Sequence, residues 1–171
     1  MRPLPQFDRP NDAELQWLQS SIEGAKQLIA RFSPSDSGQP ITSAALDSAW
    51  AAWLATTEKD VNRINEVINS IGLAFGQILV DTSGFEWVVA SDEKGCDMAI
   101  LALPGKGDVL SYPLHVIAHR WPNRETFFLE AVEEFLKKGK EETAESYEKA
   151  VRQGEQLKSA GGFFSSFVVS G

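Results

Sequence analysis

The sequence predicts an α+β fold in which helices pack on a small antiparallel sheet of about three strands. Apolar residues recur at intervals of three and four from Val61 to Ile78, which is typical of an amphipathic helix. Two short segments rich in β-branched and aromatic residues follow, and a turn ending at Gly95 separates them as in a hairpin. The 171 residues, 43% hydrophobic and 23% charged, suit one globular domain spanning residues 1–171.

The first half of the chain is expected to be helical. Three prolines mark residues 1–10 as an extended N-terminal arm, and a helix follows to about Phe32. A loop rich in turn-forming residues, 33–40, precedes a second helix that contains Trp50 and Trp53. Core packing is the expected role of four tryptophans that lie on apolar faces: Trp17, Trp50, Trp53 and Trp87.

The third helix should end near Ser83, with Gly84 in the left-handed capping position. Gly72 and Gly76 lie one turn apart within it, and each costs about 1 kcal/mol relative to Ala in a helix interior. We expect these glycines to let another backbone approach closely. A strand from Gln77 to Asp81 remains the alternative to this last part of the helix.

Strand character dominates after Gly84. Residues 85–90 alternate in polarity, residues 97–103 are apolar on both faces and should be central, and residues 109–112 give a short third strand. Pro113 ends that strand and opens a helical turn to Arg120.

The last part of the chain predicts two more helices. Asn123 is a suitable cap for a helix with an apolar face of Phe127, Phe128, Ala131, Phe135 and Leu136. Beyond Gly139 the sequence predicts a charged surface helix. Gly161 and Gly162 end it and leave an apolar C-terminal tail, residues 161–171.

A block from Gly72 to Arg120 carries a family resemblance. It contains Gly72-Leu73-Ala74-Phe75-Gly76-Gln77, then Trp87-Val88-Val89, an acidic turn ending at Gly95, and Pro113-Leu114 leading to Arg120. This pattern resembles a bacterial domain-of-unknown-function family, number 3806 in the usual series. Gln77 stands where the family leads us to expect Glu, and His119 stands where Lys is frequent. The resemblance implies an α+β fold and no particular activity.

Charge and cysteine content narrow the classes of partner. The net charge of -8 and the pI of about 4.8 argue against nucleic-acid binding, which depends on Lys and Arg. The single cysteine, Cys96, cannot form an internal disulfide, and the N-terminal residues lack the apolar core of a signal peptide. No apolar run approaches the roughly 20 residues that cross a bilayer, so we expect a cytoplasmic protein without a membrane partner.

Candidate chemistry is sparse. His115 and His119 would share one helix face and can bind a metal when a third ligand converges, but no spacing specifies that ligand. Cys96 beside either histidine would form a nucleophile, although a small buried core residue is the favoured interpretation. We therefore expect no catalytic constellation, no metal and no cofactor.

One polar and aromatic group remains as a candidate site: Trp87, His115, His119, Arg120 and Trp121. Trp121 either forms part of a groove or anchors its loop. The C-terminal tail is a candidate partner-binding segment through Phe163, Phe164, Phe167 and Val169, because exposed phenylalanines are unfavourable in water. It either docks on its own domain, for example as an edge strand, or adds to a partner or a second copy.

The leading functional hypothesis is a noncatalytic protein-binding module with an immunity- or adaptor-like role in bacteria. The alternative is a small hydrolase or metal-binding enzyme that uses His115, His119 and Cys96.

Overall fold

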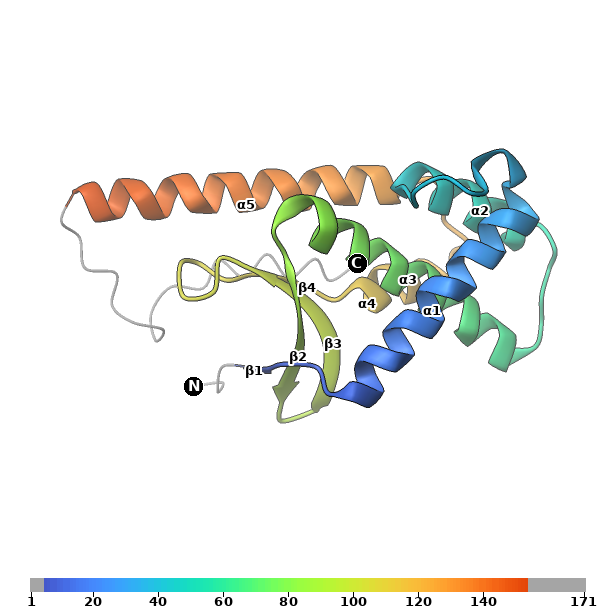
Figure 1. Ribbon diagram of the computed structural model, residues 1–171, viewed down its shortest axis with the longest axis horizontal. Coiled ribbons are helices and arrows are strands. Elements are labelled where there is room, and N and C mark those ends of the chain that lie inside the picture. Colours follow the sequence, from blue (N-terminus) through green and yellow to red (C-terminus); the bar gives the residue numbers. More distant parts are fainter. Residues whose placement is uncertain (1–4, 154–171) are drawn as a thin grey trace.

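The computed structural model describes residues 5–153 (Figure 1). The elements in chain order are β1 (Gln6–Asp8), α1 (Asp12–Phe32), a 3-10 helix η1 (Pro34–Asp36), α2 (Ser43–Leu54), α3 (Val61–Ser83), β2 (Glu86–Asp92), β3 (Gly95–Ala102), β4 (Val109–Ser111), α4 (Pro113–Ala118) and α5 (Leu129–Arg152). Within these residues no helix combines the length and the apolar character needed to cross a membrane. The predicted α+β class is confirmed.

The sheet has four strands, so the prediction of about three was wrong. All neighbouring strands are antiparallel, and their order is β1-β2-β3-β4. The additional strand lies in the N-terminal arm, where Phe7 pairs with Ala90 of β2. Prolines identified the arm as extended, but no local pattern could identify a pairing partner so far along the chain. The predicted central position of β3 is confirmed.

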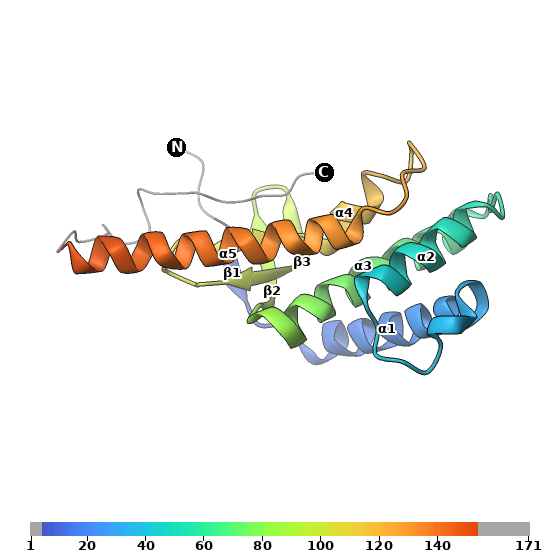
Figure 2. The ribbon, with the colours of Figure 1, turned by 90° about the horizontal axis from the view of Figure 1, so that it is seen from above.

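Helices cover one face of the sheet. Figure 2 shows α1, α2 and α3 grouped on one side of the long helix α5. Alternate residues of the strands, including Val89 and Met98, pack against Leu18 of α1 and Leu73 of α3. The main core contains Trp50, Ile71 and other fully buried side chains between the helices and the sheet.

The helical alternative for residues 77–81 is the one observed. α3 runs unbroken to Ser83, and Gly84 has a φ of 70°, as predicted for a left-handed C-cap. Asp60 caps the other end by accepting from the backbone N–H groups of Asn62 and Arg63. The strand alternative for Gln77 to Asp81 is therefore excluded.

The two helices predicted after Asn123 form one helix, α5, which begins at Leu129 and continues through Gly139. Phe127 and Phe135 are 68% and 48% exposed instead of buried. The start is displaced because the cap comes from another helix, where Asp47 accepts from the first N–H groups of α5. A single glycine did not end the helix because its cost of about 1 kcal/mol is small beside the favourable contributions of its neighbours.

The second face of the sheet is apolar as well. Val88 lies opposite Ala99, and Leu101 lies opposite Leu110, on the face away from Val89 and Met98. These residues form, with Ala90, a cluster that we call the outer sheet face. An antiparallel sheet with one helical layer usually presents polar residues on its other face, so this surface departs from the usual pattern.

Candidate functional site

Two glycines of α3 determine how closely α4 approaches. A Cβ added at Gly72 would lie 3.0 Å from the carbonyl oxygen of Pro113 and 3.1 Å from the Cα of Leu114. A Cβ at Gly76 would lie 2.4 Å from the Trp87 ring and 2.8 Å from Cγ of Pro113. The predicted close approach of another backbone is confirmed at Gly72. At Gly76 the missing side chain instead leaves space for the ring of Trp87.

α4 places both histidines on one surface. The His115 ring stacks on Tyr112 with centroids 5.2 Å apart and lies 5.8 Å from the His119 ring. His115 Nε2 is 3.5 Å from Asp97 Oδ2, and both side chains are about half exposed. Within residues 5–153, no three His, Cys, Asp or Glu side chains are arranged to hold a metal ion.

Cys96 is exposed, so the prediction of a buried core cysteine was wrong. It is the second residue of β3 and pairs with Ser91 beside the hairpin turn, whereas burial begins at Met98. Successive residues of a strand point to opposite faces, which separates Cys96 from Asp97 and its partner His115. A cysteine–histidine pair is not assembled by this arrangement.

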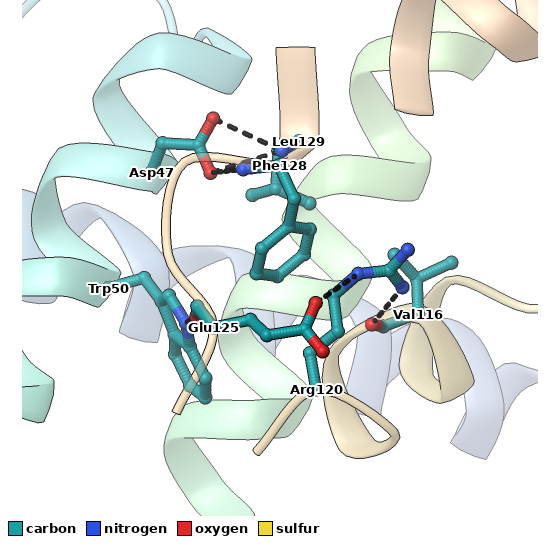
Figure 3. A network of polar contacts seen from close by, with 7 residues as sticks. All are labelled: Asp47, Trp50, Val116, Arg120, Glu125, Phe128 and Leu129. Carbon is teal, nitrogen blue, oxygen red and sulfur yellow. Dashed lines mark hydrogen bonds and ion pairs between the residues drawn. The ribbon is translucent and has the colours of Figure 1, made fainter. Parts of the chain in front are cut away.

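Arg120 makes different contacts from the histidines, and Figure 3 shows its side chain beside Val116 and Glu125. Its Nη1 donates to the carbonyl oxygen of Val116 at 2.9 Å, and its Nε is 3.5 Å from Glu125 Oε2. The guanidinium also lies over the Phe128 ring, 4.7 Å from the centroid. These contacts fold the segment between α4 and α5 back on itself.

Trp121 packs with two tryptophans of α2. Its ring centroid is 6.2 Å from that of Trp50 and 5.4 Å from that of Trp53. Trp50 Nε1 donates to the carbonyl oxygen of Glu125 at 2.8 Å, which ties the same segment to α2 (Figure 3). Of the two predicted roles for Trp121, loop anchoring describes this arrangement.

Trp87 is separate from both groups. Its indole N–H donates to Gln77 Oε1 at 2.9 Å, and its ring packs against the core beneath Gly76. The five predicted site residues therefore make three different sets of contacts: Trp87 with Gln77, the two histidines with each other, and Arg120 and Trp121 with the segment before α5 and with α2. The predicted tail residues Phe163, Phe164, Phe167 and Val169 lie outside the described residues.

Asp47 is a buried carboxylate that the sequence did not single out. Its side chain accepts from the backbone N–H groups of Phe128, Leu129 and Glu130, at distances of 3.1–3.3 Å. Burial raises the pKa of Asp47, although the three backbone hydrogen bonds act in the opposite direction. The sequence signal that could have identified it is an acidic residue in a helix that otherwise consists mainly of alanine, leucine and tryptophan, because a charge at such a position needs a buried partner. Its observed role is to cap α5 and fix α5 against α2.

A cleft of about 430 Å³ opens between α1 and α3. It was not predicted, and its lining includes Trp17, Gln27, Arg31, Arg63, Glu66 and Asn69. Trp17 is 38% exposed, so its predicted place in the core was wrong. Arg31 and Arg63 also line a second hollow of about 210 Å³, next to Trp53 and Glu58. The two arginines therefore lie between two concave surfaces.

Comparison with known proteins supplies a family and a fold. Residues 45–132 match the family described as Domain of unknown function (DUF3806), and no curated protein matches the chain. The fold is similar to that in a crystal structure of a protein from Bacteroides thetaiotaomicron VPI-5482 at 1.50 Å resolution, with a TM-score of 0.57 and 11% sequence identity. The similarity covers 90% of this chain and 49% of the other, so this chain spans about half the length of that protein. The matched segment is more than half of the chain, and it contains the whole block from Gly72 to Arg120 that carried the resemblance. The chain therefore belongs to the DUF3806 family.

Proposed function

We propose that this protein is a noncatalytic protein-binding module and that its partner contacts the cleft between α1 and α3. An immunity- or adaptor-like role in the bacterial cytoplasm is the version that we favour. The observation that carries the proposal is the exposed Trp17 in a cleft that also contains Arg31 and Arg63. Tryptophan and arginine are the residues most enriched among those that dominate binding energies at protein interfaces.

The cleft also indicates the kind of segment that would bind. Arg31 can pair with a carboxylate, whereas Arg63 already pairs with Glu66 of the same cleft at 3.1 Å. Gln27 and Asn69 can exchange hydrogen bonds with an extended backbone. Trp17 supplies a large apolar surface for an aliphatic or aromatic anchor. We therefore expect a partner segment that joins an acidic side chain to an apolar one.

The alternative, a hydrolase or metal-binding enzyme using His115, His119 and Cys96, has less support. His115 pairs with Asp97, and Cys96 belongs to the opposite face of β3. The lining of the cleft includes no histidine and no cysteine. A partner contact through the C-terminal tail remains a prediction from the sequence.

Photo-crosslinking in a lysate of the source organism tests the proposal. A benzophenone amino acid replaces Gln27 in the full chain, and the linked proteins are identified by mass spectrometry. The partner should link to this chain, and Trp17→Ala should abolish the link. Leu15→Ala is the matched control, because Leu15 is 42% exposed on the same helix but does not line the cleft.

Binding of the purified partner then measures the contribution of the cleft. Trp17→Ala should weaken the affinity about thirtyfold, which corresponds to the roughly 2 kcal/mol of a residue that dominates an interface. Leu15→Ala should leave it unchanged. Equal linking by the Trp17→Ala and unsubstituted chains, or no linked protein at all, would contradict the assignment. Loss of a catalytic activity on changing His119 to Ala would favour the enzyme alternative instead.

A further inference from the structure

The least exposed polar residues that line the cleft between α1 and α3 are two serines, Ser21 and Ser70. Each is 8% exposed, and α1 packs so closely on α3 here that a Cβ added at Gly24 would lie 2.6 Å from the Ser70 hydroxyl. Neither serine side chain forms a hydrogen bond with another residue in the described part of the chain. A ligand that presents hydrogen-bonding groups to these two hydroxyls would therefore replace the bonds that burial denies them.

One face of α1 forms a whole side of the cleft. Its lining residues recur every three or four positions from Trp17 to Arg31, as expected for one helix face. Fourteen positions at 1.5 Å each place Trp17 and Arg31 about 21 Å apart along the helix. Gly24 lies midway between them. The apolar and the basic anchor points of the cleft are therefore at opposite ends of α1.

Arg31 supplies the available positive charge at its end of the cleft. Its guanidinium lies over the Phe32 ring, 5.1 Å from the centroid, and it forms no ion pair with a residue between 5 and 153. Stacking on a ring leaves the N–H groups at the edge of a guanidinium free to bind a carboxylate. The lining has a net charge of +1, from two arginines and one glutamate, in a chain with a net charge of -8. This local positive charge favours an acidic group beside Arg31.

We propose, on the basis of the function proposed above, that the cleft binds an extended segment of a partner protein whose acidic and large apolar residues lie about six positions apart. An extended chain advances about 3.4 Å per residue, so six positions cover the distance from Trp17 to Arg31. Its backbone N–H and C=O groups are free to bond with the two buried serine hydroxyls.

A helical partner segment does not suit these features. A helix would need fourteen positions to reach from Trp17 to Arg31. Its backbone N–H and C=O groups are already bonded to one another, so they offer nothing to Ser21 and Ser70. The buried hydroxyls therefore distinguish an extended segment from a helix.

An NMR titration of the full chain with a panel of peptides tests the spacing. Each peptide carries one Glu and one Phe, in either order, separated by two, four, six or eight positions in a Gly/Ser background or by fourteen in a helical Ala-rich background. We expect the tightest binding at about six positions, affinities at least fivefold weaker at two and at fourteen, and shifts of the Ser21 and Ser70 amide signals. Equal affinity at all spacings, a maximum at fourteen, shifts at another surface or no binding would overturn the proposal.

Variants of two basic residues on α1 test the acidic contact. Arg31→Gln should weaken binding of the six-position peptide about tenfold and leave binding of the same peptide with Gln in place of Glu nearly unchanged. Lys26→Gln is the matched control, because it removes the same charge from α1 while Lys26 pairs with Glu23 and does not line the cleft. Equal losses in the two variants would overturn the proposal.

The photo-crosslink at Gln27 and the peptide panel fail separately. A partner that links at Gln27 through a helix, or through a segment without the acidic and apolar pair, supports the proposed function and overturns the spacing. A lysate without any linked protein contradicts the proposed function, whereas peptide binding by the purified chain still decides whether the cleft prefers a spacing of six.

Discussion

Three helical glycines of this protein differ in what surrounds them, and the difference has measurable consequences. Gly76 faces the Trp87 ring and Pro113, both packed against the core. A Cβ added at Gly24 of α1 would meet only Ser70, with the hydroxyl at 2.6 Å and the Cβ at 3.5 Å. Gly72 faces the backbone of α4. A hydroxyl at the end of a side chain can turn aside, but a packed indole ring and a backbone cannot.

Gly76→Ala should destabilise the protein by up to about 2 kcal/mol. Overpacking a filled site costs roughly 1–3 kcal/mol, and the better helix propensity of Ala returns about 1 kcal/mol. Urea unfolding followed by circular dichroism measures the change. Gly24→Ala is the matched control and should be neutral or stabilising by up to about 1 kcal/mol. Equal losses in both variants would contradict this account.

Asp47→Asn should destabilise the protein by about 2 kcal/mol at low pH, because both side-chain oxygens of Asp47 accept hydrogen bonds at the start of α5 and an amide nitrogen cannot accept. The folded state raises the pKa of Asp47, so its contribution is fully present below the ordinary value of 3.8 and falls as the pH rises through the raised pKa. The cost of Asp47→Asn should therefore shrink as the pH increases. Urea unfolding across pH 3–7 measures it, and a cost that grows with pH would contradict the assignment.

At the scale of elements, the contact between α2 and α5 has a second acid, Glu133, which is half-buried and whose pKa shifts in the opposite direction. Glu133 accepts from Ser43 of α2 and from Lys137 one turn away in α5. Burial alone would raise the pKa of Glu133, but these hydrogen bonds and the charge of Lys137 outweigh it and lower the pKa. Its contribution to stability is present above the ordinary value of 4.5 and is lost as the pH falls through the lowered pKa.

Glu133→Gln should cost about 1 kcal/mol at pH 7, and the cost should disappear as the pH falls below 4.5. The same unfolding series measures it. Glu134→Gln changes an exposed neighbour on α5 and should leave the free energy of unfolding unchanged at every pH in the series. A cost for Glu133→Gln that persists in acid would indicate a packing role in place of an electrostatic one.

The elements that depend on local pattern were predictable, and those that depend on distant partners were not. The period of α3, the cap at Gly84 and the turn at Pro113 follow from residues within one or two turns. The start of α5 depends on Asp47, which lies more than eighty residues earlier, so Asn123 was the wrong cap. Cys96 and Trp17 are exposed because each lies at the edge of the hydrophobic core. The position of that edge depends on which elements pack together, and the polarity of neighbouring residues in the sequence does not determine it.

The candidate site shows the same division. The shared face of His115 and His119 follows from their spacing on α4, and their ring centroids are 5.8 Å apart. The separation of Arg120 and Trp121 from those histidines depends on Glu125, Phe128 and the tryptophans of α2. The cleft between α1 and α3 arises from the approach of two helices, which no stretch of either helix encodes by itself.

At the scale of the whole molecule, α5 combines a packed first half with a second half that has fewer buried residues. The last buried residue of the helix is Thr143, and the described residues after it are half-buried or exposed. Amide hydrogen exchange should therefore be slow up to about Thr143 and faster beyond Ala144, because the later hydrogen bonds open without exposing core. Uniform protection across Leu129–Arg152 would contradict this gradient.

The pairing of Gln6–Asp8 with β2 also has a consequence for the order in which the protein is made. Ser91, the partner of Gln6, leaves the ribosome more than eighty residues after Gln6 itself. During that interval the arm has no sheet to join, while α1, α2 and α3 already have one another as neighbours. The edge beside β2 is therefore closed only after the hairpin has been made, by a segment translated more than eighty residues earlier. Until then, a hairpin from another nascent chain on the same polysome can compete for that segment.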